Sequence, residues 1–513
     1  MDNRGETRQR RIIFNWDEEC MWLPIVQNMG TSPPSAQVTK RILHEIVDEH
    51  AAAGVDTIVQ CVFGAGWRSH LPSSKATDLV PDRPPGLDEL GLDWLQMVLD
   101  DCRQHHMEFI AGLRMNDRHG MGTPSKFVSD HPQWQLSLGG WSMNYGHEPV
   151  REHMLTITEE VLDAYNVDGI EFDYMRWCHM FEKGEGAEHA PLLTEFTRKA
   201  RQLLDSAAER RGRGRLVLGV RVPQTLEECE YLGFDVAGWI REGLVDWVVP
   251  SDFFYTAFNA RTEDFVKLAA GTACKIYPAI HPPVCWTVPS RTRIMSLANY
   301  RAAAQNFYAA GADGISPYNY QGHWGQPRGA SRCGPAYMWP AALGYLRELR
   351  DPQKVKERDR HYLFYPLWAQ PRASESGFCH DDNIYLDRAG RDLAGSRRFR
   401  LSEDLSDARL RGTLQFKAVG LREEEALEIL LNGAPVPAEY VARFFDEDGQ
   451  KKSEGRVLPA FYLYAIDLNW WGDQKPPVIN GDNRLSVRLI PAGSGGEGMV
   501  VIDELEAYVY VRK

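Results

Sequence analysis

The chain has 513 residues, with 58 basic and 71 acidic side chains and a formal net charge of −13. Hydrophobic residues make up 43% and charged residues 25%, a composition typical of soluble globular proteins. The acidic balance argues against nucleic acid and anionic membranes as partners, because both repel negative charge. No apolar run is long enough for a membrane-spanning helix.

The nine cysteines are scattered and form no CxxC pair, so the sequence indicates neither a zinc knuckle nor a disulfide framework. We expect no metal and no cofactor. The first residues, MDNRGETRQRR, are charged and lack the apolar core of a secretory signal. We therefore expect a cytoplasmic protein, or a secreted one if a signal was removed, and we leave assembly into a homo-oligomer open.

In the first two thirds of the chain, helical stretches repeatedly stop near Gly or Asn and lead into an apolar strand. Strands are expected to start near residues 12, 55, 107, 167, 215, 245, 275 and 312, with amphipathic helices between them. This alternation predicts an α/β fold, a (β/α)8 TIM barrel over residues 1–355. A doubly wound open sheet is the alternative, but no convincing glycine fingerprint follows the first strand.

The hydrophobic pattern of the sequence changes after the charged stretch RDPQKVKERDR, residues 350–360. Short alternating runs, among them RLRGTLQFKAV and NRLSVRLI, are separated by turn signals such as NGAP and GDN. This spacing predicts an antiparallel β-sandwich as an accessory domain over residues 356–513.

The aspartates of the barrel fall into two groups. Those at expected strand entrances are assigned structural roles, because catalysis in such barrels takes place at the carboxyl ends of the strands. They are Asp56, Asp168, Asp246 and Asp313. Asp173 lies five residues beyond Asp168, roughly 16 Å along a strand, and so falls at the functional end.

Alternation along the strands predicts which side chains point into the barrel. It sends Glu171 and Asp173 inward on the fourth strand, and Arg176 follows that strand in the sequence. A purely structural barrel would fill the inward positions with branched aliphatic side chains. A ring of polar groups indicates an active or ligand site instead, although any single pair could be a structural ion pair. The same count places further residues at the mouth of the barrel, which is the end where the strands terminate. They are Asn15, Asp17, Arg114, Asn116, Arg221, His281 and Tyr318.

The sixth strand, VDWVVPSDFF, offers a second carboxylate in Asp252. Strict alternation sends Ser251 inward and Asp252 outward, but Pro250 often marks a bulge at which the alternation slips. Asp252 is therefore either a catalytic acid or a loop-capping residue. Glu171, one layer deeper, is the other candidate acid, although a deep carboxylate more often orients its neighbours.

Tryptophans are frequent in the loops predicted at the mouth. Trp141 lies in the long connection after the third strand, whereas Trp177 and Trp286 lie in other loops. Aromatic faces suit the apolar faces of sugar rings, and arginines and amides suit their hydroxyl groups. The alternative is that these tryptophans only anchor long loops.

Four segments resemble the signature runs of glycosyl-hydrolase-like family ten: HPQW (131–134), EPVRE (148–152), YNVDGIEFDYMR (165–176) and VDWVVP (245–250). The resemblance covers residues 10–345 and implies a carbohydrate-active barrel, often with β-sandwich appendages. The run DGIEFD is also similar to the fourth strand of α-amylase-type barrels, whose last Asp is the nucleophile. That role would fall on Asp173.

This chain departs from the family pattern at two places. Tyr174 stands where the family usually has a second Asp, and Ser251-Asp252-Phe253 stands where it tends to have Gln and an aromatic residue. Chitinase-type barrels also resemble the strand-four run, but Met175 occupies the place of their acid Glu. A chitinase-type mechanism is therefore disfavoured.

These observations predict a glycoside hydrolase that cleaves an oligo- or polysaccharide. Asp173 is expected to act as nucleophile or base and Asp252 as general acid, because glycosidic cleavage needs both roles. Arg114 and Arg221 would keep Asp173 ionised. The further expected substrate-binding residues are Asp17, Asn116, Trp141, Glu171, Arg176, His281, Trp286 and Tyr318.

Two other classes remain open. One is a carbohydrate-binding pseudoenzyme, which has the same mouth but no competent acid. The other is a different barrel enzyme, such as a metal-dependent hydrolase or a sugar isomerase. The metal-dependent enzymes usually carry an HxH pair on the first strand, where this chain has NWDEE.

Overall fold

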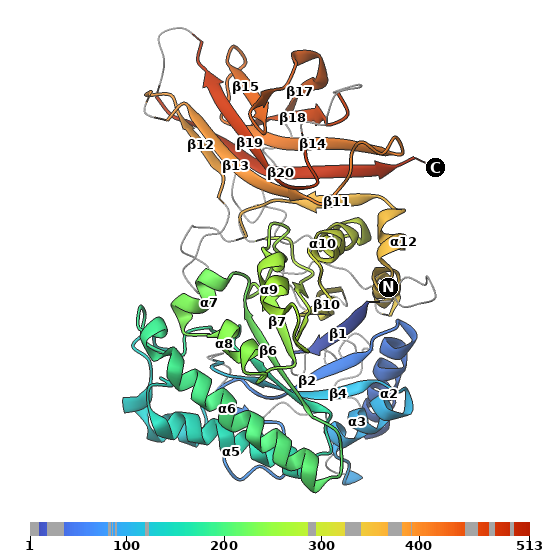
Figure 1. Cartoon of the computed structure of the whole chain (residues 1–513), viewed down its shortest axis with the longest axis vertical. Coiled ribbons are helices and arrows are strands. Elements are labelled where there is room, and N and C mark those ends of the chain that lie inside the picture. The colour runs from blue at the N-terminus through green and yellow to red at the C-terminus, as the bar shows by residue number, and fades with distance from the viewer. Residues whose placement is uncertain are drawn as a thin grey trace. The chain divides into compact units, whose positions relative to one another are not determined.

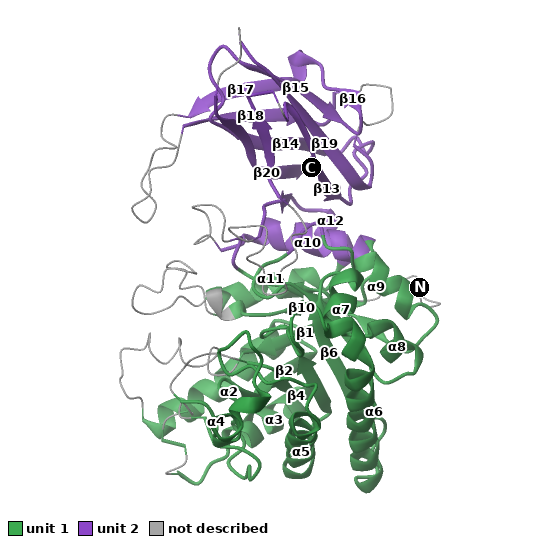
Figure 2. Ribbon diagram, turned by 90° about the vertical axis from the view of Figure 1, so that its left-hand side faces the viewer, with its two compact units in different colours: residues 1–256, 260–282, 310–351 green, residues 257–259, 283–309, 352–513 purple. Residues whose placement is uncertain are grey.

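The structure is a computed structural model. It describes residues 10–17, 35–80, 84, 86–87, 90–117, 123–285, 294–323, 340–367, 382–390, 392–446, 460–470, 478–492 and 497–512. The chain divides into two compact units, which are coloured separately in Figure 2. Unit 1 comprises residues 1–256, 260–282 and 310–351, and unit 2 comprises residues 257–259, 283–309 and 352–513. The domain boundary expected between residues 355 and 356 stays a prediction.

Unit 1 is built on a ten-stranded sheet with the order β8-β7-β6-β5-β4-β2-β1-β10-β9, to which β3 is added beside β2. All pairs are parallel except β2 with β3. The strands, drawn in Figure 1, are β1 (Arg11–Trp16), β2 (Thr57–Gly64), β3 (Arg68–Ser69), β4 (Glu108–Arg114), β5 (Gly169–Asp173), β6 (Val217–Pro223), β7 (Trp247–Ser251), β8 (Lys275–Ile276), β9 (Ala279–Ile280) and β10 (Gly314–Pro317).

The two ends of this sheet belong to one segment of the chain. Strands β8 and β9 are separated only by Tyr277 and Pro278; β8 pairs with β7, and β9 pairs with β10. The sheet thus has the strand order of a TIM barrel, but the ladder is interrupted at Pro278 and the barrel is not closed by continuous pairing. The expected parallel α/β architecture is confirmed, and each predicted strand begins within two residues of its expected start.

Helices connect the parallel strands, as the alternating pattern predicts. The side chain of Ser35 accepts a hydrogen bond from the Val38 amide at the start of α2, and Asp93 caps α3 in the same way. The helices of unit 1 are α2 (Ala36–Ala52), α3 (Trp94–Gln104), α4 (Lys126–Asp130), α5 (Glu148–Ala164), α6 (Gly186–Arg210), α7 (Leu226–Leu232), α8 (Val236–Arg241), α9 (Thr262–Ala269), α11 (Gly344–Leu349) and the 3-10 turns η3 (Pro132–Trp134), η5 (Tyr320–His323) and η6 (Ala341–Leu343).

The aspartates at the strand entrances fasten neighbouring strands together. Each accepts the backbone N–H at or near the start of the adjacent strand, at 2.8–3.1 Å, and each also contacts a basic side chain. Their structural assignment is confirmed by these contacts. The four pairs of carboxylate and amide are Asp56 with Ile12, Asp168 with Phe109, Asp246 with Leu218, and Asp313 with Ile276.

Unit 2 contains two antiparallel sheets, of six and four strands. In β14 every second residue is buried, so one face of this strand is covered and the other is partly exposed. The six-stranded sheet consists of β11 (Arg360–Leu363), β20 (Met499–Val511), β14 (Leu410–Val419), β18 (Phe461–Asp467), β17 (Val441–Asp446) and β12 (Ile384–Asp387), and the four-stranded sheet of β13 (Ala394–Leu401), β19 (Gly481–Ile490), β15 (Ala426–Leu431) and β16 (Ala434–Pro435).

The described residues of unit 2 also form two helices, α10 (Leu297–Ala309) and α12 (Pro352–Lys356), and the 3-10 turn η7 (Ala438–Tyr440). Two amides of α10 donate to backbone carbonyls of the sheets, Asn299 to His361 at 2.8 Å and Asn306 to Arg400 at 3.1 Å. Helix α10 is therefore joined to the antiparallel sheets by buried polar contacts. No helix among the described residues of either unit is both long and apolar enough to cross a membrane.

Candidate active site

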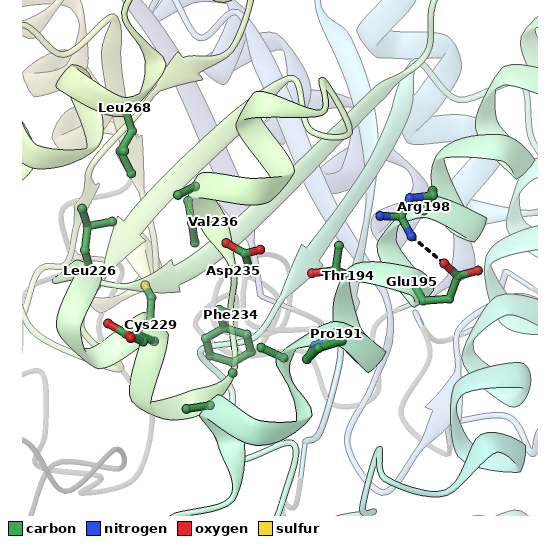
Figure 3. A pocket seen from close by; sticks show the side chains of 15 residues that line it. Pro191, Thr194, Glu195, Arg198, Leu226, Cys229, Phe234, Asp235, Val236 and Leu268 are labelled. Carbon is green, nitrogen blue, oxygen red and sulfur yellow. Dashed lines mark hydrogen bonds and ion pairs between the residues drawn. The ribbon is translucent and has the colours of Figure 1, made fainter.

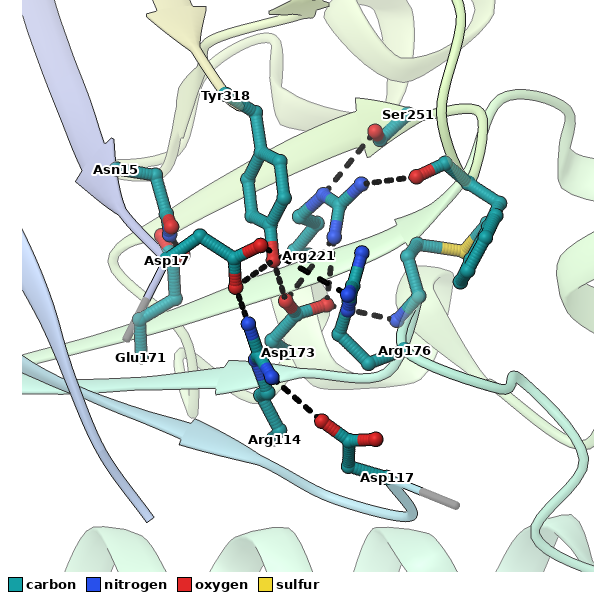
Figure 4. Close-up of polar contacts among 12 residues, drawn as sticks. Asn15, Asp17, Arg114, Asp117, Glu171, Asp173, Arg176, Arg221, Ser251 and Tyr318 are labelled. Carbon is teal, nitrogen blue, oxygen red and sulfur yellow. Dashed lines mark hydrogen bonds and ion pairs between the residues drawn. The ribbon is translucent and has the colours of Figure 1, made fainter. Parts of the chain in front are cut away.

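The carboxyl ends of the parallel strands bring a group of charged side chains together inside unit 1 (Figure 4). The strand register places Arg114 of β4 beside Asp173 of β5, and Asp173 beside Arg221 of β6. Asp17 follows β1 and Tyr318 follows β10. Five side chains that lie far apart in the sequence therefore meet at one end of the sheet, as the alternation predicts.

Asp173 is held by hydrogen-bond donors on both carboxylate oxygens. Arg221 Nη1 donates to Oδ1 at 2.9 Å and to Oδ2 at 3.0 Å. The Met175 amide also donates to Oδ1, at 2.8 Å, and the Tyr318 hydroxyl lies 3.0 Å from Oδ2. Only 3% of Asp173 is exposed. Asp173 is thus a buried carboxylate whose two oxygens both accept hydrogen bonds, and one of its donors is a cation.

Arg221 joins the end of β5 to the end of β7. It is fully buried, and besides Asp173 it donates to Ser251 Oγ at 3.1 Å and to the carbonyls of Asp252 and Phe253 at 3.0 and 3.4 Å. Its guanidinium carbon lies 3.7 Å from the centre of the Tyr318 ring. Because these contacts use each of its three nitrogens, Arg221 holds the protein's own groups in place.

Asp17 is the second carboxylate of the mouth. It pairs with Arg114 Nη2, and its Oδ2 lies 3.7 Å from Arg176 Nη2. The Tyr318 hydroxyl lies 3.2 Å from Asp17 and 3.0 Å from Asp173. One hydroxyl carries one proton, so Tyr318 donates to only one of these carboxylates at a time. Burial and the nearby charge of Asp173 raise the pKa of Tyr318 well above its ordinary value, which keeps that proton in place.

Arg114 has a second acidic partner that the sequence analysis missed. Its Nη1 donates to Asp117 at 2.6 Å, and Asp117 is fully buried. The three-residue spacing of Arg114 and Asp117 was visible in the sequence, but Asp117 lies past the end of β4, where alternation no longer applies.

Glu171 lies one layer below Asp173 on the same strand. Its carboxylate accepts from Trp247 Nε1 at 2.9 Å and from the Asn15 amide at 3.3 Å, so it links β7 and β1 across the interior. Burial raises the pKa of Glu171 to about 7, against the opposing effect of the Trp247 hydrogen bond; the charge of Asp173 raises it further. Glu171 is thus engaged by protein groups below the mouth.

Trp247 reaches Glu171 only because Gly219 has no side chain. A Cβ at Gly219 would lie 2.0 Å from Trp247 Nε1. The register also places Gly112 of β4 and Gly219 of β6 on either side of Glu171. The repeated pattern Gly-x-Arg, GLR at 112–114 and GVR at 219–221, is the sequence signal that could have revealed this layer.

Ser251 and His281 form the wall of the mouth next to Arg221. Ser251 Oγ lies 3.1 Å from His281 Nε2, and Thr256 Oγ1 accepts from the His281 amide at 2.7 Å. Burial, together with the charges of Arg221 and Arg176, lowers the pKa of His281 well below its ordinary value. His281 is therefore a neutral hydrogen-bonding group near neutral pH.

Strict alternation holds through β7, and Ser251 points inward. Pro250 pairs with Val222 in the regular ladder, and Ser251 bonds to Arg221 inside the barrel. Asp252 follows in a turn, where its Oδ1 accepts from the amides of Phe254 and Tyr255 at 2.9 and 3.0 Å. The slip at Pro250 that would have turned Asp252 inward does not occur. Asp252 is partly exposed, and its role as general acid stays a prediction.

Asn116 ties two loops together. Its amide nitrogen donates to the carbonyls of Met143 and His179 at 3.0 and 2.7 Å, and its oxygen accepts from the Met143 amide at 2.8 Å. These bonds occupy both amide protons, so the contacts show Asn116 holding the loops after β4 and β5. Its expected sugar contact stays a prediction.

The two tryptophans assigned to the substrate have different outcomes. Trp141 is partly exposed and has a left-handed backbone, with φ 68°, but within the described residues it has no hydrogen bond or ring contact with the arginine–carboxylate group. Trp286 lies outside the described residues. Within the described part of the chain, no group of three or more His, Cys, Asp and Glu side chains is arranged to hold a metal ion.

A cavity of about 790 Å³ opens elsewhere on unit 1, among α6, α7, α8 and α9 (Figure 3). Its lining includes Cys229 and Phe234, and also Glu195 and Arg198, which pair with each other at 2.5 Å. None of the predicted site residues lines it. We place the candidate active site at the strand ends, because that is where buried carboxylates and arginines converge.

No protein-family model and no curated protein matches this chain, so its resemblance to glycosyl-hydrolase-like family ten stays a prediction. Solved structures do resemble it at low identity. The glycoside hydrolase domain of PgaB (BpsB) from Bordetella bronchiseptica is 12% identical, with 67% of this chain and 99% of that chain covered and a TM-score of 0.39.

Two further solved structures are similar to the same degree. The endo-1,4-beta-mannanase from Rhizomucor miehei is 9% identical, with coverage of 69% of this chain and 96% of that chain and a TM-score of 0.41. A structure described as a glycoside hydrolase is 9% identical, with 93% and 92% covered and a TM-score of 0.37. These likenesses are too distant to assign a reaction to this chain.

Proposed function

We propose that this chain is a glycoside hydrolase that cleaves an oligo- or polysaccharide at the carboxyl ends of the parallel strands. One observation carries the proposal: a buried Asp173, bonded to Arg221, lies beside a second carboxylate, Asp17, in a mouth lined with arginines. Glycosidases use carboxylates on either side of the scissile bond, and a barrel places such groups at this end.

Asp173 is the proposed nucleophile, or the base that activates water. The donors on both of its oxygens fix its orientation, as attack on an anomeric carbon requires. The Tyr318 hydroxyl has an alternative acceptor in Asp17, so it can release Asp173 Oδ2 without losing a hydrogen bond.

Asp17 is the proposed stabiliser of the transition state. Its Oδ1 and the Oδ2 of Asp173 lie at most about 6 Å apart, because each is about 3 Å from the Tyr318 hydroxyl. Arg114 and Arg176 favour the charged form of Asp17, which therefore suits hydroxyl binding and electrostatic support better than proton donation. The oxocarbenium-like transition state of glycoside hydrolysis carries positive charge, and a fixed anion beside it lowers its energy.

Asp252 is the proposed general acid, and its position in a turn makes a precise test possible. Asp252→Asn keeps Oδ1 as an acceptor for the two turn amides but removes the proton that an acid must donate. Asp252→Ala removes both the acceptor for the turn amides and the acidic proton. If Asp252 acts as the acid, both variants lose turnover; if it only caps the turn, the Asn variant stays active.

The decisive experiment is Asp173→Asn, assayed on aryl glycosides and on reduced neutral oligosaccharides. We expect the turnover number to fall by about 10⁴-fold, the scale on which one member of a catalytic group acts, while oligosaccharide binding is retained. Asp168→Asn is the matched control, because Asp168 lies at the entrance of the same strand, where it accepts the Phe109 amide. This control should keep its turnover.

The same variants separate hydrolysis from binding alone. Unchanged turnover in Asp173→Asn would overturn the assignment of Asp173. A wild-type protein that binds these sugars and cleaves none of them would favour the carbohydrate-binding pseudoenzyme instead.

A further inference from the structure

Two partly exposed aromatic residues lie beside the candidate active site. Trp177 lies four residues beyond Asp173, and Phe253 lies two residues beyond the end of β7. Their ring centroids are 5.5 Å apart, with the planes inclined by 60°. The loops after β5 and β7 therefore bring two aromatic side chains into contact at the mouth.

The backbone of Trp177 is in a conformation that bulky residues rarely adopt. Its φ is 64°, in the left-handed region. For a residue with a large side chain this conformation is strained, and such conformations cluster at ligand sites. The conformation turns the chain just after Arg176, so that Trp177 meets Phe253.

The two rings are fixed by the arginines that also hold the carboxylates. The Arg176 guanidinium lies 5.0 Å from the centre of the Phe253 ring and 6.0 Å from that of Trp177, and its Nη2 lies 3.7 Å from Asp17. Arg221 donates to the Phe253 carbonyl as well as to Asp173. The aromatic pair is thus positioned relative to the reacting groups by shared partners.

The charges of the mouth indicate what kind of ring would bind there. Three arginines face three aspartates, and each arginine lies within 4 Å of at least one of these carboxylates. Among the described residues named here, these pairs leave no excess of positive charge to attract an acidic sugar, and Glu171 can only add negative charge. A neutral sugar ring, apolar on one face and hydroxylated at its edge, fits an aromatic surface bordered by such pairs.

We propose that Trp177 and Phe253 form a stacking subsite for a neutral pyranose ring of the glycan, next to the bond at which Asp173 acts. The subsite rests on the proposed hydrolase function for its place in a reaction, but the binding it provides is a separate property. It gives the mouth a preference for uncharged oligosaccharides.

The test measures binding in the absence of turnover. In Asp173→Asn, calorimetry with a panel of neutral oligosaccharides and their uronic acid counterparts gives dissociation constants for each sugar. We expect Trp177→Ala and Phe253→Ala each to weaken binding of the best neutral ligand by roughly three- to tenfold, the scale of one aromatic contact. Trp177→Phe keeps a ring and should retain most of the affinity, which also guards against a misfolded Ala variant.

Trp134→Ala is the matched control, because the Trp134 ring stacks on His131 at 3.8 Å within the loop after β4. Its affinity should be unchanged. In the active protein, the same Ala substitutions should raise KM and leave kcat nearly constant.

Several results would overturn the subsite: unchanged affinity in both Ala variants, tighter binding of the uronic acid series, or no binding of any neutral oligosaccharide. Hydrolysis that is insensitive to Trp177 and Phe253 refutes the subsite but leaves the hydrolase function standing. Binding that depends on both rings, without any hydrolysis by the wild type, supports the subsite and refutes the hydrolase function.

Discussion

The two ends of the parallel sheet use the same residue types for different purposes. At the strand entrances, the side chains of Asp168 and Asp246 are 22% exposed and accept a backbone amide. They pair with Arg213 and Arg215, which are 33% and 46% exposed, and Asp246 also contacts the buried Arg201. At the strand exits, the side chains of Asp17 and Asp173 are only 4–5% exposed and contact arginines that are themselves buried. Burying charges costs several kcal/mol per ion and often adds no net stability. The comparison therefore points to the exits as the functional end.

The same substitution at each end tests this comparison most strongly. Lysine has three donors on a single nitrogen, whereas the arginine guanidinium spreads five donors over three nitrogens and so reaches acceptors that lie farther apart. Arg221→Lys should therefore lose the simultaneous contacts to Asp173, Ser251 and the β7 turn, and kcat should fall by about 100-fold, as when one preorganised donor is removed. Steady-state kinetics on a cleaved glycoside measures this.

Arg213→Lys is the counterpart at the entrances, where Arg213 contacts Asp168 near the surface. It should leave kcat unchanged and alter the free energy of unfolding by less than about 1 kcal/mol. Equal losses of kcat in the two variants would show that the ends do not differ in function.

Much of this arrangement could be predicted from sequence, because it follows from periodicity. The starts of the strands and the inward direction of Asp173, Arg221 and Tyr318 depend only on alternation within a parallel sheet, and all agree with the structure. The entrance aspartates follow from position alone, since the amino ends of barrel strands are structural.

Other features depend on contacts between segments that are far apart, and periodicity does not encode them. The tie between Asn116 and the Met143 and His179 backbone is set by how two loops fold. The cap formed by Asp252 arises in a turn, after the alternation of β7 has ended. Strand parity could place these residues near the mouth, but it could not name their partners.

The second prediction concerns Glu171, one layer below the exits. The folded pKa of about 7 is above the ordinary value of 4.5, so between these pH values the native state holds a proton that the unfolded chain has lost. The wild type should therefore lose stability as pH rises through this window, by about 3 kcal/mol in total, and no further above it. Glu171→Gln cannot titrate and should lack this change.

Urea unfolding of both proteins from pH 4 to pH 8 measures the difference. Trp247→Phe sharpens the test, because it removes a hydrogen bond that lowers the pKa of Glu171 and should extend the window to higher pH. Parallel stability curves for wild type and Glu171→Gln would contradict a raised pKa in the folded state.

The smallest effect is expected at the entrances, where the aspartates fasten neighbouring strands. Asp246 accepts the Leu218 amide at 2.8 Å and contacts Arg201 and Arg215 at 3.1 and 2.7 Å. Asp246→Ala leaves a partly buried amide without its acceptor, which costs about 1–3 kcal/mol of unfolding free energy. Turnover per folded molecule should not change, because Asp246 is at the opposite end of β7 from Ser251.

Asp313→Asn should have a smaller effect on stability. The cation that contacts Asp313, Lys275, is 3.6 Å away and well exposed, and an amide oxygen can still accept from the Ile276 amide. The loss of unfolding free energy should therefore stay below about 1 kcal/mol. Chemical unfolding ranks the two variants, and a fall in kcat for either one would mean that the entrance and exit aspartates are functionally coupled.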